Sequence, residues 1–115
     1  MSQMIGIAGY GFVGQAVHSC MNDECDVVLY DPPKGREPID ALLRCDAIFC
    51  CLPTPTDPLN SVQGRQNFSF YENFFKAING YDGTLIIKST VLYKHLAKYI
   101  HEFAIVYNPE FLNQN

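Results

Sequence analysis

The chain has 115 residues, of which 48% are apolar and 17% are charged, and its formal net charge is −4. A chain of this length can bury about two-thirds of its unfolded surface, which excludes intrinsic disorder and fibrous architectures and predicts one compact domain. The eight lysines and arginines form no basic stripe that would neutralise a run of phosphates, so no nucleic-acid partner is expected.

Hydropathy and cysteine spacing limit the class of protein further. No run approaches about 18 consecutive apolar residues, and no basic region precedes an apolar run at the N-terminus, so we expect a cytoplasmic protein with no membrane partner. The five cysteines form no Cys-x-x-Cys pair and have no histidine at metal-ligand spacing. They are therefore expected to be reduced thiols that pack as small apolar side chains, without a metal site.

The first part of the chain predicts a strand, a helix and a second strand. Residues 4–8 form an apolar run that ends at Gly9, which is typical of a strand buried on both faces. Apolar residues at helical spacing then predict a helix over 12–21. A second strand is predicted over 26–30, where two following prolines end it.

The middle of the chain predicts a short helix over 38–44 and a third buried strand over 47–52. Residues 53–68 exceed the usual length of a loop, so this segment is expected to be functional or mobile. The sequence Ser-Phe-Tyr-Glu that follows has a serine and a glutamate at capping-box spacing, which predicts a helix over 69–78.

The last part predicts a strand over 84–88, a helix over 92–101 and a strand over 104–107. Strands that are apolar throughout and alternate with helices predict a parallel sheet covered on both faces. The expected fold is therefore a Rossmann-type three-layer α/β fold with a parallel five-stranded sheet. Right-handed crossovers and a reversal after the third strand would give the strand order 3-2-1-4-5.

A glycine pattern lies between the first predicted strand and the first predicted helix. Residues 9–14, Gly-Tyr-Gly-Phe-Val-Gly, fit G-x-G-x-x-G. In this pattern the first glycine permits a tight turn, the second lets a diphosphate approach the backbone, and the third lets the helix pack against the strand. Amide N–H groups at the start of the helix would bind the phosphates. The candidate cofactor-binding residues of this segment are Gly9, Gly11, Phe12, Val13 and Gly14.

Asp31 ends the second predicted strand, close to the spacing of about 20 residues expected for the acid that binds the adenosine ribose. A carboxylate at this place accepts hydrogen bonds from ribose hydroxyls and repels a 2′-phosphate, which favours NAD over NADP. Lys34 and Arg36 follow closely, and they would hold a 2′-phosphate if their loop folded inward.

Four blocks of sequence, each at the end of a predicted strand, occur in a specific order: the glycine segment 7–14, Cys-Leu-Pro-Thr-Pro-Thr at 51–56, Ile-Lys-Ser-Thr-Val at 87–91 and Asn-Pro-Glu-Phe-Leu at 108–112. Together they resemble the N-terminal domain of the UDP-glucose 6-dehydrogenase and GDP-mannose dehydrogenase family. The glycine segment is shared with many dehydrogenases, including the β-hydroxyacid dehydrogenases, whereas the last block argues for the nucleotide-sugar family.

This family oxidises C6 of a nucleotide-bound hexose to a carboxylate with NAD, through covalent intermediates on a cysteine. Besides the glycine segment, the cofactor-binding residues that the resemblance implies are Asp31, Pro53, Thr54, Thr56 and Thr90. The resemblance also implies two catalytic residues. Thr90 would position the catalytic water or the substrate oxygen, and Glu110 would act as an acid/base or orient water.

Simpler interpretations of the same residues stay open. Thr90 also fits as the cap of the following helix, and Glu110 fits as an acid in the first turn of a helix. Pro53 also fits as a residue that only ends a strand. Lys88 is expected to be a solvated charge at a strand end.

The sequence also departs from the family. The nucleophilic cysteine, the central helix and the sugar-nucleotide domain of the family have no counterpart in residues 1–115, so we expect a single, truncated NAD-binding domain that is inactive by itself. A nucleotide sugar would bind only in a complete enzyme. The alternative is a stand-alone dinucleotide-binding or regulatory module without redox catalysis. An exposed edge strand of the unfinished sheet would allow a homodimer.

Overall fold

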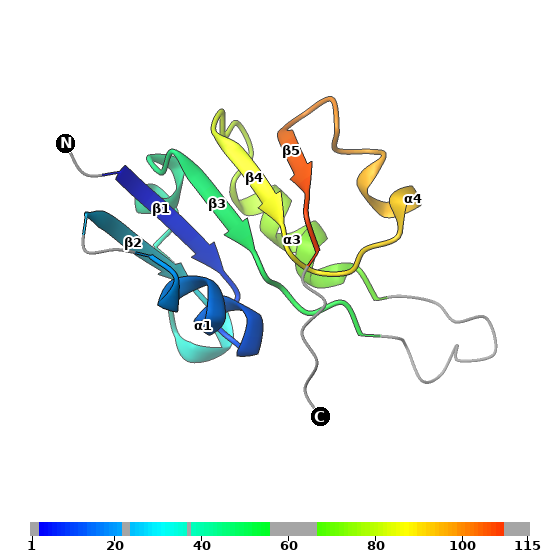
Figure 1. The fold of residues 1–115 in the computed structure, drawn as a ribbon. Coiled ribbons are helices and arrows are strands. Elements are labelled where there is room, and N and C mark those ends of the chain that lie inside the picture. The colour runs from blue at the N-terminus through cyan, green and yellow to red at the C-terminus, as the bar shows by residue number, and fades with distance from the viewer. Residues whose placement is uncertain (1–2, 22–23, 37, 56–66, 110–115) are drawn as a thin grey trace.

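The computed structural model describes residues 3–21, 24–36, 38–55 and 67–109. Within these residues a five-stranded parallel sheet forms the centre of the molecule (Figure 1). Its strands are β1 (Gln3–Ala8), β2 (Cys25–Tyr30), β3 (Ala47–Cys50), β4 (Thr84–Ile87) and β5 (Ala104–Tyr107). All four pairings between neighbouring strands are parallel. The predicted α/β fold with a parallel five-stranded sheet is confirmed.

The order of the strands is β2-β1-β3-β4-β5, so the predicted order 3-2-1-4-5 is wrong. β3 pairs with β1 on the side opposite to β2. Burial agrees with this arrangement: β1 is buried from Ile5 onward and β3 is buried at alternate residues, whereas β2 is only half-buried over most of its length. The least buried of these three strands therefore lies at the edge of the sheet.

The helix α2 (Ile39–Leu43) sits in the short connection between β2 and β3. Its Leu42 is fully buried, and a Cβ added at Gly6 of β1 would lie only 2.8 Å from Leu42 Cδ2 and 3.1 Å from Ile48 Cγ1 of β3. The missing side chain of Gly6 thus makes room for Leu42 next to both β1 and β3.

The other helices of the described residues are α1 (Phe12–Ser19), α3 (Ser69–Ala77) and α4 (Tyr93–Leu96), and a 3₁₀ turn, η1 (Pro32–Lys34), follows β2. α4 is shorter than predicted because residues 97–102 form turns. The predicted capping box of α3 does not form. Phe68 is the N-cap and makes no side-chain cap bond, while the N–H of Ser69 donates to Asn67 Oδ1 at 2.9 Å.

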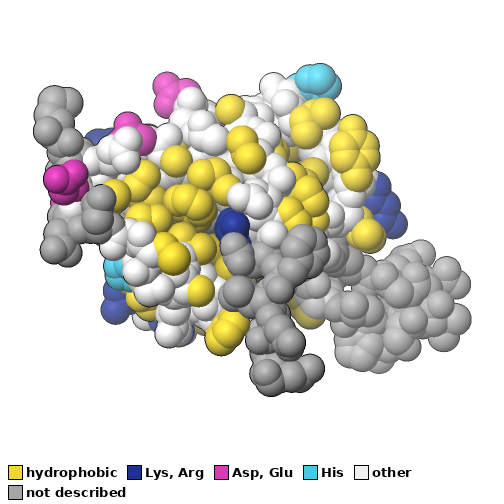
Figure 2. All heavy atoms as spheres, in the orientation of Figure 1, with side chains coloured by type: hydrophobic (Ala, Val, Ile, Leu, Met, Phe, Trp, Pro, Cys, Tyr) yellow, Lys and Arg dark blue, Asp and Glu magenta, His cyan; other side chains and the backbone are white. Residues whose placement is uncertain are grey.

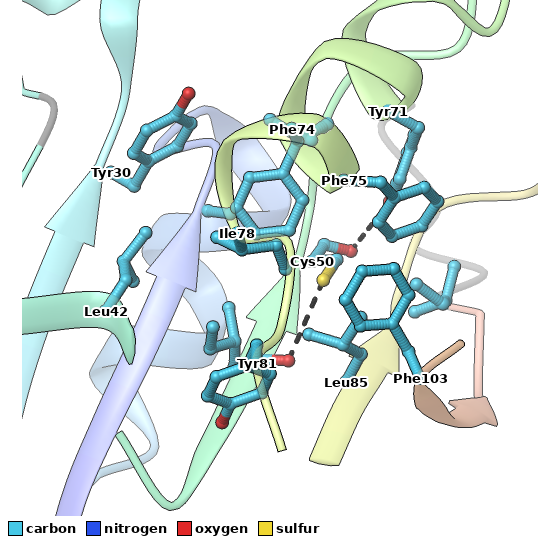
Figure 3. Close-up of a cluster of buried hydrophobic side chains, with 14 of the residues drawn as sticks. Tyr30, Leu42, Cys50, Tyr71, Phe74, Phe75, Ile78, Tyr81, Leu85 and Phe103 are labelled. Carbon is cyan, nitrogen blue, oxygen red and sulfur yellow. Dashed lines mark hydrogen bonds between the residues drawn. The ribbon is translucent and has the colours of Figure 1, made fainter. Parts of the chain in front are cut away.

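The main apolar core lies on the face of the sheet that carries α3 and α4. Cys50 of β3 and Leu85 of β4 are fully buried there, in one cluster with Phe74 and Phe75 of α3 (Figure 3). Phe75 also stacks on Phe103, with ring centroids 5.3 Å apart. Burial raises the pKa of the Cys50 thiol well above its usual value, as expected for a cysteine that packs as a small apolar side chain.

α1 covers the opposite face of the sheet, in front of β1 and β2 (Figure 1). On this face Phe49, Ile86 and Val106 lie in register across β3, β4 and β5. Phe49 and Ile86 are half-buried and Val106 is 49% exposed. Figure 2 shows apolar side chains gathered on this face. The described residues therefore cover the two faces of the sheet unequally.

The described residues hold no group of three or more His, Cys, Asp or Glu side chains that could bind a metal ion. No helix among them is long and apolar enough to cross a membrane.

Candidate functional site

A cavity of about 850 Å³ lies at the carboxyl ends of β1, β3 and β4. One side of it, which we call the glycine side, is formed by residues 9–13 and Asp31. The facing part, which we call the wall, is formed by residues 51–54 and 88–90. Because the strand order reverses between β1 and β3, the cavity is at the place where open α/β sheets bind ligands.

The glycines shape the glycine side by close backbone contacts. Gly9 has φ +91°, and a Cβ at this residue would lie 2.6 Å from the Cys51 carbonyl oxygen. A Cβ at Gly14 would collide with the Gly9 carbonyl oxygen. These contacts agree with the turn and packing functions predicted for the two residues. A Cβ at Gly11, by contrast, would meet no described atom within 4 Å, so its backbone faces open space where a ligand can approach.

The N-terminus of α1 opens into this cavity. Gly11 is its N-cap, and no side chain of the described residues caps it. Phe12 and Val13 begin the helix and line the cavity. The first N–H groups of a helix have no partner within the helix, and the helix dipole favours an anion next to them. This end of α1 is thus suited to bind a phosphate group.

Asp31 lies at the end of β2, as predicted, and is only 9% exposed. Its Oδ2 accepts a hydrogen bond from the Tyr10 N–H at 2.9 Å, so the acid also fixes the glycine segment. Lys34 Nζ is 3.9 Å from the same oxygen and donates to the Tyr10 carbonyl at 2.8 Å. The loop of Lys34 therefore folds inward, toward the acid.

Backbone bonds close this loop. The Asp31 N–H donates to the Arg36 carbonyl at 2.7 Å and the Arg36 N–H donates to the Asp31 carbonyl at 3.1 Å. Gly35 permits the tight turn because it adopts the left-handed conformation, with φ +74°. The loop brings Lys34, rather than the exposed Arg36, into contact with the glycine segment.

The wall joins two of the sequence blocks. Thr54 Oγ1 donates to the Thr90 carbonyl at 3.0 Å, which holds the exit of β3 next to the exit of β4. Pro53, Thr54 and Thr90 all line the cavity, as their expected positions near a cofactor require. Thr56 and Glu110 lie outside the described residues.

The prediction that Lys88 is a solvated charge at a strand end is wrong. This lysine is only 8% exposed and lines the cavity, so it is not a solvated charge. Its N–H donates to the Cys50 carbonyl at 2.9 Å, and the Asn108 N–H donates to the Ile87 carbonyl at the same distance. The end of β4 is therefore enclosed by the exits of β3 and β5, because β4 is an inner strand.

Sequence reasoning missed several cavity residues. Phe70 and Asn73 of α3 line the cavity three positions apart on one face of the helix. Ser89 lines it from the wall and lies in a block that the sequence had already marked. On the glycine side, the Tyr10 hydroxyl pairs with His18 Nδ1 at 2.7 Å, six residues into the helix that the segment opens. The spacing of three residues within the predicted helix could have shown that Phe70 and Asn73 lie on the same face of it.

No family model matches the sequence. The chain is 29% identical over 106 residues to erythronate-4-phosphate dehydrogenase of Marinomonas sp. (strain MWYL1), and the match covers 83% of this chain and 28% of the relative. Its structure superposes on a crystal structure of a ternary complex of GDP-mannose dehydrogenase from Pseudomonas aeruginosa with a TM-score of 0.71. That match has 20% identity and covers 95% of this chain and 36% of the other.

The chain has a Rossmann-like α/β fold that it shares with part of a solved dehydrogenase. The resemblance to the UDP-glucose and GDP-mannose dehydrogenase family is thus confirmed in fold by a solved dehydrogenase. The chain spans little more than a third of that dehydrogenase and less than a third of the curated relative.

Proposed function

We propose that this domain binds NAD as the cofactor domain of a nucleotide-sugar 6-dehydrogenase, which would oxidise the C6 hydroxyl of a nucleotide hexose to a carboxylate. The observation that carries the proposal is that the open N-terminus of α1, Asp31 and the two threonines of the wall line one cavity. The similarity in sequence to a curated dehydrogenase and in fold to a solved one supports it.

Each part of the cavity would bind one part of a dinucleotide. The N–H groups of Phe12 and Val13 would bind the diphosphate, which Gly11 leaves room for. Asp31 uses Oδ2 for the Tyr10 N–H and has a second carboxylate oxygen for a ribose hydroxyl. Thr54 and Thr90, on the wall, would lie beside the nicotinamide half together with Pro53 and Thr56.

Bound NAD would supply the hydride acceptor for the oxidation. Thr90 is an exposed residue of the wall, and its hydroxyl would hold the substrate oxygen or a water molecule. Glu110 follows β5 closely in sequence and would take or orient the proton that leaves this oxygen. The nucleotide sugar needs a second surface to bind, so residues 1–115 alone should bind the dinucleotide without turnover.

Calorimetric titration of the 115-residue chain with NAD and NADP tests the proposal. We expect NAD to bind more tightly than NADP, because Asp31 repels a 2′-phosphate and Lys34, although its loop folds inward, already donates to the Tyr10 carbonyl and pairs with Asp31. Asp31→Ala should weaken NAD about tenfold, the effect of losing one hydrogen bond to a charged group. Asp82→Ala, at an exposed turn away from the cavity, is the matched control and should leave the affinity unchanged.

A second variant separates the two tasks of Asp31. The amide oxygen of Asp31→Asn can still accept the Tyr10 N–H, but the variant has no charge to repel a phosphate. We therefore expect it to bind NADP nearly as well as NAD. Unchanged NAD affinity in both Asp31 variants would remove the ribose assignment, and rapid reduction of NAD by residues 1–115 with UDP-glucose would contradict the expected lack of turnover.

A further inference from the structure

The wall of the cavity is made of two chain segments that need to be held together. Residues 51–54 leave β3 and residues 88–90 leave β4, and neither segment belongs to a helix or strand. The Thr54 hydroxyl joins them at their exposed end by its bond to the Thr90 carbonyl. Their buried ends require other partners.

Two hydroxyl groups, that of the buried Tyr71 and that of the half-buried Ser89, supply these partners. Tyr71 of α3 is fully buried, and its hydroxyl donates to the Cys50 carbonyl at 2.9 Å (Figure 3). The same hydroxyl lies 2.6 Å from Ser89 Oγ. Ser89 in turn donates to the Leu52 carbonyl at 2.5 Å. The network thus links α3 to both segments of the wall.

The protons of the network can be assigned. Each hydroxyl has one proton to donate, and Ser89 gives its proton to Leu52. The Tyr71 proton is then shared between the Cys50 carbonyl and Ser89 Oγ. Burial, and next the neighbouring Cys50, raise the pKa of Tyr71 well above its usual value, so its hydroxyl stays protonated and remains a donor.

Packing alone does not require a tyrosine at position 71. The other buried residues of α3 are Phe74 and Phe75, which fill the same core without a polar atom. Placing a hydroxyl in the interior costs free energy unless it is hydrogen-bonded. All the bonds of this hydroxyl go to the exits of β3 and β4, beneath the wall, and Tyr71 is not among the described residues that line the cavity.

We propose that Tyr71 and Ser89 are positioning residues that hold the wall in place for the nicotinamide half of the cofactor. The inference rests on the proposed function, because it assigns the wall to that half. Tyr71 acts only through Ser89 and the backbone of β3, and it does not touch the ligand. Ser89 acts in the same network from inside the cavity.

Tyr71→Phe tests the inference because it removes only the hydroxyl. The variant should fold, since the Cys50 carbonyl still accepts the Lys88 N–H at 2.9 Å and Ser89 still donates to Leu52. The matched control is Tyr81→Phe. The Tyr81 hydroxyl is also a buried donor to a carbonyl, that of Cys45 at 2.8 Å, but Cys45 precedes β3, at the opposite end of the sheet.

Calorimetry with two probes, NAD and ADP-ribose, separates positioning from a general loss of structure, because ADP-ribose lacks the nicotinamide. For Tyr71→Phe we expect about fivefold weaker binding of NAD, the effect of one neutral hydrogen bond, and unchanged binding of ADP-ribose. Tyr81→Phe should bind both probes like the wild type. Thermal unfolding checks that both variants are folded.

Ser89→Ala is the second variant and keeps the inference testable if Tyr71→Phe fails to fold. It should weaken NAD and spare ADP-ribose. Because both residues act in one network, the double variant should weaken NAD by less than the product of the two single effects.

The outcomes separate this inference from the proposed function. If the wild type binds NAD and the Tyr71 and Ser89 variants bind it equally well, the inference alone is overturned. Equal weakening of NAD and ADP-ribose, or the same loss in Tyr81→Phe, would show a merely structural effect and also overturn it. If the wild-type chain binds neither probe, the proposed function fails as well.

Discussion

The glycine side of the cavity is built mainly from backbone, whereas the wall is held by side-chain hydroxyls. On the glycine side, Gly9 and Gly14 allow close contacts between main-chain atoms, and Asp31 bonds the Tyr10 N–H. In the wall, Thr54 and the pair of Tyr71 and Ser89 bond carbonyl groups of two separate segments. Backbone contacts tolerate almost no added atom, while a hydroxyl network can lose one bond and persist. The two sides should therefore respond differently to substitution.

The largest effect is expected for Gly14→Ala. The added methyl would collide with the Gly9 carbonyl oxygen, and neither backbone can move without breaking the contact of α1 with β1. We expect the free energy of unfolding to fall by about 3 kcal/mol, at the upper end of the cost of overpacking. Urea denaturation measures it, and a loss below about 1 kcal/mol would show that α1 can shift freely.

Gly11→Ala should change stability less than Gly14→Ala does, and it should weaken the binding of NAD instead. A Cβ at Gly11 meets no described atom within 4 Å, so stability should change by less than about 1 kcal/mol. The methyl would instead occupy the space of the diphosphate, and NAD should bind at least about tenfold more weakly, equal to about 1.4 kcal/mol. Comparing urea denaturation with calorimetry for the two glycine variants tests whether packing and ligand approach are separate functions.

The smallest effect is expected for the pH dependence of the free energy of unfolding, which His95 should cause from its place beside the start of α3. His95 stacks on Phe68, the N-cap of α3, with ring centroids 4.9 Å apart, and its Nε2 has no partner among the described residues. Burial lowers the pKa of His95 below its ordinary value of 6.5, and the nearby Lys94 and Lys98 add to this. The unfolded chain therefore binds more protons at this site, and stability should fall as the pH drops through about 6.5.

The variant His95→Phe tests this pH dependence. It keeps a stacking ring and removes the titration, so the difference in the free energy of unfolding between pH 7.5 and pH 5 should become smaller than in the wild type. His101→Phe, at an exposed position, is the matched control and should leave this difference unchanged. An unchanged pH dependence in His95→Phe would exclude His95 as its source.

The sequence predicted the elements of the fold better than their arrangement. All five strands form near their predicted ranges, because apolar runs bounded by glycine and proline are local signals. The order of the strands was wrong because β3 can reach either edge of the β1–β2 pair with a right-handed connection. The packing of Leu42 into the space above Gly6 favours one edge, and a contact of this kind has no local signal.

The sequence predicted part of the cavity and missed other parts of it. Glycine spacing and Asp31 located the glycine side, since backbone geometry depends on residue type at fixed positions. The tyrosine of the wall's network was missed because its partners lie about 20 residues away in the sequence, in β3 and after β4. The burial of Lys88 was missed because it depends on the exits of β3 and β5, which contact the end of β4 but lie far from Lys88 in the sequence.

By itself, the amino-acid sequence determined the alternation of strands and helices, the turn at residues 9–14 and the acid that follows β2, because each depends on residues close together in the chain. The tertiary structure alone decided which strands are neighbours, and therefore that the exits of β1, β3 and β4 form one cavity. It also placed the Tyr71 hydroxyl beneath the wall. These features depend on contacts between distant residues, which form only when the whole core has packed.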